Sequence, residues 1–240
     1  MPGFRFVDCH SHVVPSGDDG AASVEDGVAL CRKAASRSTG LLFATPHVWP
    51  HLPLTPGREA ATRSAFERVR EAAGLELRLG FELTPSEALL EEDLQRYVLE
   101  GTDCVLMEVP FMGGAELLFA LAERVERARL RPVIAHPERT EAVLDDPEIA
   151  EELAARGWLL QVNATSLTAD HGPSAAELAW QLIEGGHVAL VASDGHRSSR
   201  PPHLDAAFAA VRARVGADRA KPLFDGSALG LSSRPLEVAV

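Results

Sequence analysis

The chain has 240 residues, 46% of them hydrophobic, which fits one α/β barrel-sized domain with a large core. Its formal net charge of −12 and its lack of a basic stripe argue against nucleic-acid binding through phosphate contacts. It has three irregularly spaced cysteines and no apolar run near the roughly 20 residues of a membrane-spanning helix, which predicts a cytoplasmic protein that is not inserted in a membrane.

Strand-like and helix-like segments alternate along the chain. Apolar runs bounded by proline or glycine predict seven strands, at 4–10, 41–46, 75–83, 104–110, 131–136, 158–163 and 187–193. Apolar residues at helical spacing predict helices at 23–36, 58–73, 115–130, 147–156, 175–184 and 204–215. This alternation favours parallel strands in a distorted seven-stranded TIM-like barrel, in a single domain spanning 1–240. A doubly wound open sheet is the alternative architecture.

The first predicted strand ends in His10-Ser11-His12, which Asp18-Asp19-Gly20 follows at a short distance. Residues two apart in an extended chain share a face, so both imidazoles can reach one metal ion. Asp8 lies on the same face and could orient one of these ligands from behind. A His-x-His pair arises readily by chance, but its place at a strand end, followed by two aspartates, favours a metal site.

Two carboxylates lie inside apolar strands, Glu82 in Gly80-Phe81-Glu82-Leu83 and Glu108 in Met107-Glu108-Val109. A buried carboxylate without a partner costs several kcal/mol, so each needs a cation. A metal ion is the simplest cation for both, and an ion pair with an arginine is the alternative.

Three further histidines follow predicted strands, in Thr45-Pro46-His47, in Ala135-His136-Pro137-Glu138-Arg139 and in Asp194-Gly195-His196. The last motif repeats the two-residue spacing with one carboxylate and one imidazole. The carboxyl ends of parallel strands meet at one edge of a sheet, so these side chains predict a centre with more than one metal ion. Mixed imidazole and carboxylate ligands suit Mn, Fe, Co or Zn better than Mg alone.

Taken together, the motifs resemble the PHP family, named for its polymerase and histidinol phosphatase members. Within it they look most like the capsule-associated bacterial tyrosine phosphatases. Six motifs, in order and nearly along the whole chain, carry this resemblance: the run from His10 to Gly20, Ala44-Thr45-Pro46-His47, the Glu82 strand, Glu108-Val109-Pro110-Phe111, Ala135-His136-Pro137-Glu138-Arg139 and Ala192-Ser193-Asp194-Gly195-His196. The resemblance implies a distorted (β/α)7 barrel of the PHP type.

The same resemblance implies three divalent metal ions, with Mn preferred and Fe, Zn, Co or Mg as alternatives. It implies one ligand set for each ion: His10, His12, Glu82 and Asp194 for the first; the bridging Glu82 with Glu108 and His136 for the second; Asp19, His47 and His196 for the third. Asp18 is the alternative to its neighbour Asp19. Arg139 and Arg200 resemble the catalytic arginines that the tyrosine-phosphatase branch places against the phosphate.

The activity implied is that of a metal-dependent protein-tyrosine phosphatase that uses a metal-activated bridging hydroxide, without a phosphocysteine intermediate. Its partner would be the phosphotyrosine tail of an autophosphorylated bacterial tyrosine kinase of capsule or exopolysaccharide export. A PHP phosphatase for small phosphomonoesters such as histidinol phosphate is the nearest alternative. A non-catalytic metal-binding regulator is an alternative of another class, and the acidic charge disfavours a nuclease. Both a monomer and a small homo-oligomer are compatible with the sequence.

Overall fold

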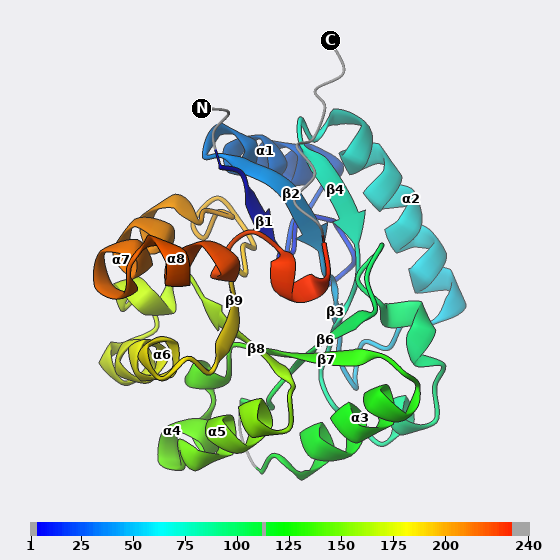
Figure 1. Ribbon diagram of the computed structural model, residues 1–240. Helices are drawn as coiled ribbons and strands as arrows, with labels where there is room; N and C mark the ends of the chain where they lie inside the picture. The colour runs from blue at the N-terminus through cyan, green and yellow to red at the C-terminus, as the bar shows by residue number, and fades with distance from the viewer. Residues whose placement is uncertain (1–3, 112–113, 232–240) are drawn as a thin grey trace.

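The strands form two parallel sheets in the computed structural model, which describes residues 4–111 and 114–231 (Figure 1). The first sheet has three strands in the order β1 (Phe6–Asp8), β2 (Thr39–Ala44), β4 (Glu76–Leu79). The second has six in the order β3 (His47–Val48), β5 (Glu82–Leu83), β6 (Cys104–Glu108), β7 (Arg131–Ala135), β8 (Leu159–Asn163), β9 (Val188–Ala192). All neighbouring pairs are parallel. The predicted parallel α/β class is therefore confirmed.

The described residues do not form a closed barrel, and two of the seven predicted strands differ from the structure. The predicted strand 75–83 is interrupted, and the predicted strand 41–46 ends at Ala44, with a further short strand beginning just beyond it. Pro46 separates β2 from β3, and Gly80 separates β4 from β5. Proline offers no N–H to a sheet, and glycine inside a strand often marks a bend. The segments β2–β3 and β4–β5 stay in contact across these breaks, since Gly80 N donates to Ala44 O (2.8 Å) and Glu82 N donates to Pro46 O (3.2 Å).

The two sheets also meet on their other side. A single parallel bridge joins Ser11, after β1, to Gly195, after β9. Asp194 N donates to His10 O (3.0 Å), and His12 N donates to Gly195 O (2.7 Å). These bonds bring the carboxyl ends of β1 and β9 together, although the two sheets remain separate.

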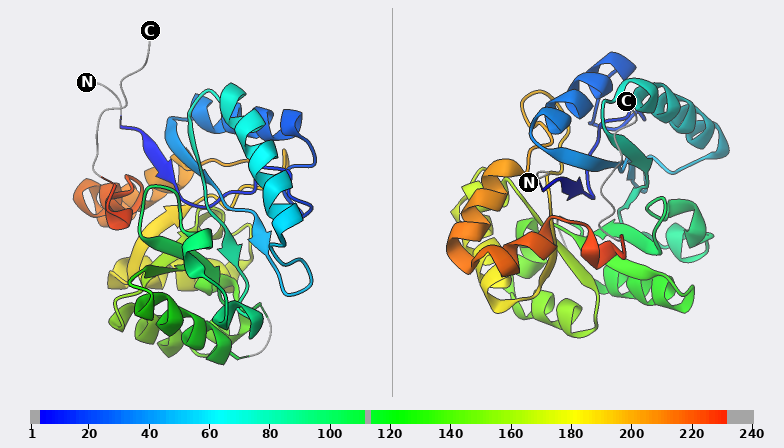
Figure 2. Two further views of the ribbon diagram at one scale, coloured as in Figure 1. Left: turned by 90° about the vertical axis from the view of Figure 1, so that its right-hand side faces the viewer. Right: turned by 45° about the horizontal axis from the view of Figure 1, so that its top comes forward.

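The helices lie around the outside of the strands (Figures 1 and 2). They are α1 (Val24–Ser36), α2 (Pro56–Ala72), α3 (Glu116–Arg127), α4 (Glu141–Asp145), α5 (Glu148–Ala155), α6 (Pro173–Gly185), α7 (Asp205–Val215) and α8 (Ala217–Ala220). Side chains of Ser23 and Thr55 cap α1 and α2 by accepting from backbone N–H groups of the first turn. All six predicted helices are present, and the short α4 and α8 are additional. None of these helices, within the described ranges, is long and apolar enough to cross a membrane.

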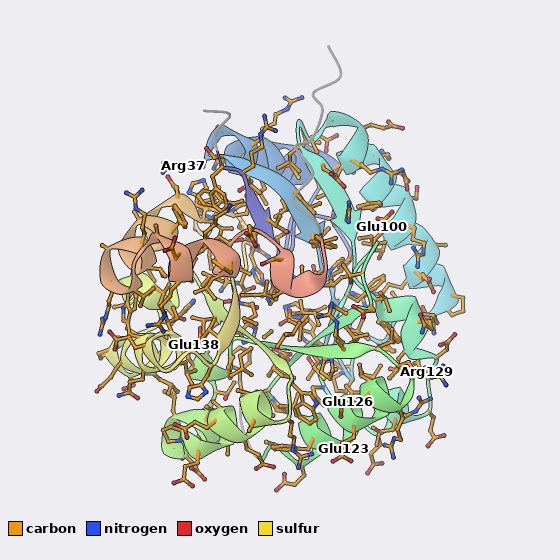
Figure 3. The ribbon with its side chains drawn as sticks, in the orientation of Figure 1. Arg37, Glu100, Glu123, Glu126, Arg129 and Glu138 are labelled. Atoms are coloured by element: carbon orange, nitrogen blue, oxygen red, sulfur yellow. The ribbon has the colours of Figure 1, made fainter. Side chains whose placement is uncertain are left out.

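Charged side chains lie mainly on the outside, as Glu123, Glu126 and Arg129 show at the exposed side of α3 and in the loop after it (Figure 3). The interior is mostly apolar. A group of buried polar residues stands out against that background: Asp8, His10, Ser11, His12, Thr45, His47, Glu82, Glu108, His136, Glu138, Gln161, Asn163, Ser193, Asp194 and His196. They lie on the strands or directly after them, so the fold buries one polar cluster among the strand ends.

Gly27 lets α1 pack closely against the segment that follows His12. A Cβ atom at Gly27 would lie 2.2 Å from the carbonyl oxygen of Val13. We expect Gly27→Ala to destabilise the protein by about 1–3 kcal/mol, although alanine is normally the better helix former. Gly57, near the start of α2, is the matched control, since a Cβ there meets nothing within 4 Å. Gly57→Ala should be neutral or stabilise by up to about 1 kcal/mol. Urea unfolding measures both, and a more stable Gly27→Ala variant would contradict the close approach.

Candidate metal centre

The sequence-predicted ligands come from the carboxyl side of many strands. His10 and His12 follow β1, and His136 follows β7. The other predicted ligands on or after strands are His47 at the start of β3, Glu82 at the start of β5, Glu108 at the end of β6, and Asp194 and His196 after β9. His136 (φ 34°) and Asp194 (φ 52°) have left-handed backbone conformations that non-glycine residues rarely adopt. Such strain concentrates at functional sites, where the surrounding structure maintains it.

Glu82 lies at the centre of this group. Its Oε2 atom is 3.0 Å from His10 Nε2, 3.2 Å from His12 Nε2 and 2.9 Å from His47 Nδ1. Its other oxygen, Oε1, is 3.0 Å from His136 Nε2. Within the described residues Oε2 is buried yet has no partner with hydrogen-bond geometry. Several donor atoms therefore point at one carboxylate oxygen without bonding to it, an arrangement that suits a shared cation.

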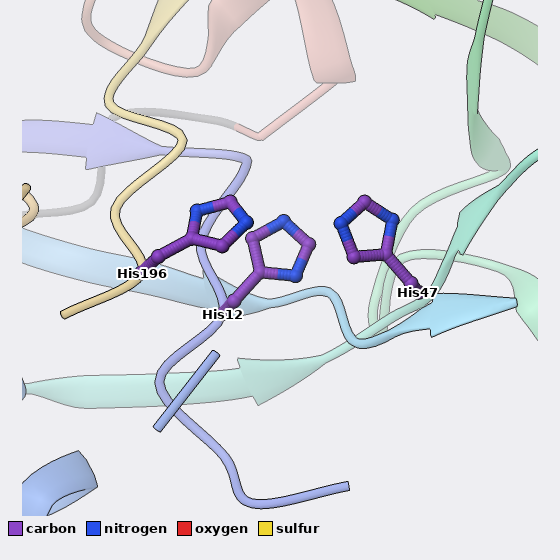
Figure 4. Close-up of side chains that lie close together, drawn as sticks. All are labelled: His12, His47 and His196. Atoms are coloured by element: carbon purple, nitrogen blue, oxygen red, sulfur yellow. The ribbon is translucent and has the colours of Figure 1, made fainter. Parts of the chain in front are cut away.

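Seven of the nine predicted ligands fall into three overlapping groups whose ligand atoms lie within 4.8 Å of one another. The groups are His10, His12 and Asp194; His10, Glu82 and His136; and His12, His47 and His196. In the last group the His12 ring centroid is 4.2 Å from that of His47 and 3.9 Å from that of His196 (Figure 4). The three groups share members, so together they make one continuous cluster.

The two adjacent aspartates have different surroundings. Asp19 Oδ1 lies 3.6 Å from His47 Nε2 and 3.4 Å from His196 Nε2, and the Asp19 side chain is 57% exposed. The side chain of Asp18 is buried, and its two oxygens accept from Gly20 N (3.1 Å) and His47 N (3.0 Å). Asp19 therefore faces His47 and His196, while Asp18 stabilises the loop and has its Oδ2 atom 3.7 Å from His12 Nδ1.

Glu108 is a predicted ligand that lies outside the three groups of candidate ligands. Its Oε1 atom accepts a hydrogen bond from the Thr84 hydroxyl, and its buried Oε2 atom has no partner among the described residues. Burial and the negative charge of Glu82 raise the pKa of Glu108 to about 8. The charge of Glu82 thus acts on Glu108, but Glu108 is not a member of the three groups of candidate ligands.

The electrostatics of the cluster fit divalent cations. Burial alone would raise the pKa of Glu82, but the charges of His10 and His47 hold it well below its ordinary value. Burial would likewise lower the pKa of His12, but the carboxylates of Asp18, Asp194 and Glu82 hold it well above. Buried carboxylates of this kind need positive charge beside them. Metal ions supply that charge, and imidazole nitrogens and carboxylate oxygens are suitable ligands for them.

Both predicted catalytic arginines converge on Asp194. Arg139 donates from Nη1 to Asp194 Oδ2 at 2.7 Å. Arg200 Nη2 lies 3.8 Å from Asp194 Oδ1 and contacts the Nδ1 atom of His196. The side chains of Arg139 and Arg200 remain 17% and 27% exposed, so both guanidinium groups lie beside the cluster and reach solvent.

Several polar and aromatic residues at the site were not among the predicted site residues. Gln161 and Asn163 on β8 are fully buried and hydrogen-bond to His10 and Asp194. Trp49 stacks on His47 with ring centroids 4.3 Å apart, and Phe111 stacks on His136 at 5.6 Å. The alternation Gln161-Val162-Asn163 in an otherwise apolar strand was the one sequence signal for the buried pair.

The chain also contains one Cys-x5-Arg spacing, the signature of phosphocysteine enzymes, from Cys31 to Arg37. The signature has no catalytic setting here. Cys31 is buried inside α1, and burial raises the pKa of its thiol to about 12. A buried thiol of that kind is a poor nucleophile.

A family model for capsular polysaccharide synthesis, CpsB/CapC, matches residues 6–229. The chain belongs to the CpsB/CapC family. Among relatives of this CpsB/CapC protein, the tyrosine-protein phosphatase YwqE of Bacillus subtilis (strain 168) is 27% identical over 238 residues, or 96% of this chain and 93% of YwqE. The predicted capsule-type tyrosine phosphatase branch is thereby confirmed.

Solved structures agree with the family. A chain from the crystal structures of YwqE from Bacillus subtilis and CpsB from Streptococcus pneumoniae, described as unique metal-dependent tyrosine phosphatases, is similar to this CpsB/CapC protein. Its TM-score is 0.81 at 25% identity, over 90% of each chain. The phosphotriesterase homology protein from Escherichia coli has a TM-score of 0.58 at 10% identity, over 96% of this chain and 98% of that one. This second likeness shows a shared fold alone.

Proposed function

We propose that this CpsB/CapC protein is a metal-dependent tyrosine-protein phosphatase, a hydrolase of phosphoric monoesters. The observation that carries the proposal is the arrangement around Glu82, whose two oxygens lie within 3.2 Å of nitrogens from His10, His12, His47 and His136. Two arginines lie beside the same cluster, and relatives of matching length are named tyrosine-protein phosphatases.

The cluster would hold up to three divalent ions, with Mn preferred over Fe, Zn, Co or Mg for its mixed ligands. The proposed ligand sets are His10, His12, Glu82 and Asp194; Glu82, Glu108 and His136; and Asp19, His47 and His196. Ions bound there would lower the pKa of water and neutralise charge on the phosphoryl oxygens. His136 and Asp194 have left-handed backbone conformations, which persist only where the surrounding structure maintains them.

The two arginines would hold the phosphate. The guanidinium of Arg139 presents N–H donors in a planar fork that matches two phosphoryl oxygens at once. Its contact with Asp194 keeps it pointed at the cluster while part of it remains exposed. Arg200 lies beside the Oδ1 atom of Asp194, whereas Arg139 donates a hydrogen bond to the Oδ2 atom of the same carboxylate. We therefore expect the arginines to contact different non-bridging oxygens as charge moves onto the leaving group.

Aromatic side chains at the site favour an aromatic substrate. Phe111 is 43% exposed and stacks on His136, and Trp49 is partly exposed and stacks on His47. Exposed aromatic surface beside a phosphate site suits the phenyl ring of phosphotyrosine. A phenolate leaving group, with a pKa near 10, also needs less help from a protein acid than an alkoxide does.

The family points to the setting of this activity. We propose that the physiological substrate is the phosphotyrosine tail of a bacterial tyrosine kinase of capsule or exopolysaccharide export, encountered in the cytoplasm. We further propose that residues 1–240 act as one domain of the PHP type, a distorted (β/α)7 barrel interrupted at Pro46 and Gly80. Both a monomer and a small homo-oligomer are compatible with this proposal.

Metal analysis of the purified protein, combined with phosphate release from a phosphotyrosine peptide with and without added Mn²⁺, tests the proposal. We expect two to three ions per chain and phosphate release that depends on them. The matched substrate is histidinol phosphate, which offers the same phosphate on an aliphatic alcohol. Bound metal with faster turnover of histidinol phosphate would move the function to small phosphomonoesters. A protein without metal or activity would favour the non-catalytic regulator.

A further inference from the structure

A chain of hydrogen bonds runs along β8 and connects two of the proposed metal ligands. His10 Nδ1 lies 2.8 Å from Gln161 Oε1. Gln161 Nε2 donates to Asn163 Oδ1 at 2.9 Å, and Asn163 Nδ2 donates to Asp194 Oδ2 at 2.8 Å. Gln161 and Asn163 are fully buried, and their two-residue spacing places both on the same face of the strand. A strand that supplies no proposed ligand thus touches a ligand at each end of this chain.

The order of donors and acceptors in this chain is fixed. A carboxylate oxygen only accepts, so the amide nitrogen of Asn163 faces Asp194 and its oxygen faces Gln161. The nitrogen of Gln161 consequently points at Asn163, and its oxygen accepts from His10. The proton of neutral His10 must then be on Nδ1, which leaves the lone pair of Nε2 directed at Glu82 Oε2, 3.0 Å away.

The backbone around Asn163 is held as well. Glu138 is fully buried between η3 (Pro137–Arg139), β8 and α6, and its Oε1 atom accepts from Asn163 N at 2.9 Å (Figure 3). The hydroxyl of Ser166 donates to the same oxygen at 2.7 Å. Glu138 therefore holds the backbone at the carboxyl end of β8, while the side-chain amides of Gln161 and Asn163 contact His10 and Asp194.

Stability alone gives little reason for this arrangement. Burying two amides is costly unless both are bonded, and a matched apolar pair would be about as stable. The pair instead acts on groups that need orientation, since Asp194 has a left-handed backbone and His10 must present one particular nitrogen. Partners behind metal ligands commonly fix the tautomer and ring orientation.

We propose that Gln161 and Asn163 are a positioning pair that presets the His10 tautomer and the Asp194 carboxylate. The pair thereby sets the affinity for the ion that these two ligands would share. This inference rests on the proposed metal centre. Neither residue needs to touch substrate, and β8 acts on the reaction only through the ligands that it orients.

The test is a Mn²⁺ titration of the purified full chain, with Gln161→Met as the main variant. Methionine keeps the length of the side chain but removes both the acceptor for His10 and the donor to Asn163. We expect the Mn²⁺ Kd to rise by about 10- to 100-fold. Gln161→Glu keeps the acceptor for His10 Nδ1 but loses the donor to Asn163, so its Kd should rise less than that of Gln161→Met.

Val162→Ala is the matched control, because Val162 lies between the pair on β8 and is buried in the apolar core. It weakens the packing of the strand and leaves the hydrogen-bonded chain in place, so its Mn²⁺ Kd should not change. Proton–nitrogen NMR of the metal-free parent, at a pH where His10 is neutral, should in addition show the His10 proton on Nδ1, because without an ion on Nε2 the acceptor on Gln161 is what sets the tautomer.

The outcomes separate the two proposals. A Gln161→Met variant that binds Mn²⁺ as tightly as the parent, or loses affinity only as much as Val162→Ala does, overturns the positioning role and leaves the metal centre intact. If Gln161→Met does not fold, a His10 proton on Nε2 in the parent spectrum overturns it instead. A parent protein that binds neither Mn²⁺ nor Zn²⁺ overturns the metal centre, and the positioning pair with it.

Discussion

Glu82→Gln is expected to remove metal ions from the centre and to lower kcat/KM for a phosphotyrosine peptide by on the order of 10³-fold or more. Glu82 contacts histidines of all three groups of candidate ligands, since its oxygens reach His10, His12, His47 and His136. Glutamine has nearly the same shape but no charge, and its amide nitrogen would turn a donor toward the ions. Metal content per chain and steady-state kinetics at a fixed Mn²⁺ concentration measure the two effects.

The control for this substitution is Glu59→Gln. Glu59 is a partly exposed carboxylate that pairs with Arg63 and Arg96 on the helical outside of the fold. Ion pairs of this kind contribute about 0–1 kcal/mol, so Glu59→Gln should keep full metal content and activity. Circular dichroism should show that both variants fold. A folded Glu82→Gln protein with parental metal content and turnover would remove Glu82 from the centre of the site.

The helices and strands could be predicted from the sequence because each one shows its own pattern of buried apolar residues within a short segment. Strands such as 131–136 and 187–193 are buried on both faces and read as continuous apolar runs, and helices such as 23–36 carry a cap and an apolar face. The convergence of strand-end histidines could also be predicted, since parallel strands place their carboxyl ends at one edge. At that edge His10 lies in one ligand group with His136 and in another with Asp194.

Other features depend on contacts between distant segments. The division of the predicted strand 75–83 at Gly80, and the short strand β3 beyond Pro46, follow from how β2–β3 and β4–β5 bend past each other, which no local pattern records. Asp18 and Asp19 are equivalent in sequence, and only the positions of His47 and His196 distinguish them.

The site also includes residues that no sequence motif marked as functional. Gln161 and Asn163 looked like two polar residues in a strand. Their role in the structure comes from the partners at both ends of their hydrogen-bonded chain, and those partners are more than 30 residues away.

Arg139→Lys is expected to lower kcat/KM by on the order of 10²-fold while the metal content stays at the parental value. Lysine keeps the positive charge but loses the planar fork that can hold two phosphoryl oxygens. The shorter reach of a single ammonium also gives up the 5.1 Å contact of the guanidinium over the Phe111 ring. Asn163 still bonds to Asp194 Oδ2, so the carboxylate should keep its orientation for the ions. Steady-state kinetics and metal analysis of the same preparation measure both quantities.

Arg156→Lys is the matched control for this substitution, because Arg156 ends α5 before β8 begins and forms exposed ion pairs with Glu152 and Glu123 instead of contacts with the cluster. It should leave kcat/KM unchanged. If Arg139→Lys also loses metal, the main task of Arg139 is to hold Asp194, and the phosphate must be bound by Arg200 and the ions. If it keeps both metal and full activity, charge alone is sufficient at this position and the bidentate contact with phosphate is wrong. The expected result, a large loss of turnover with an intact centre, separates substrate binding by the arginine from metal binding by the carboxylate beside it.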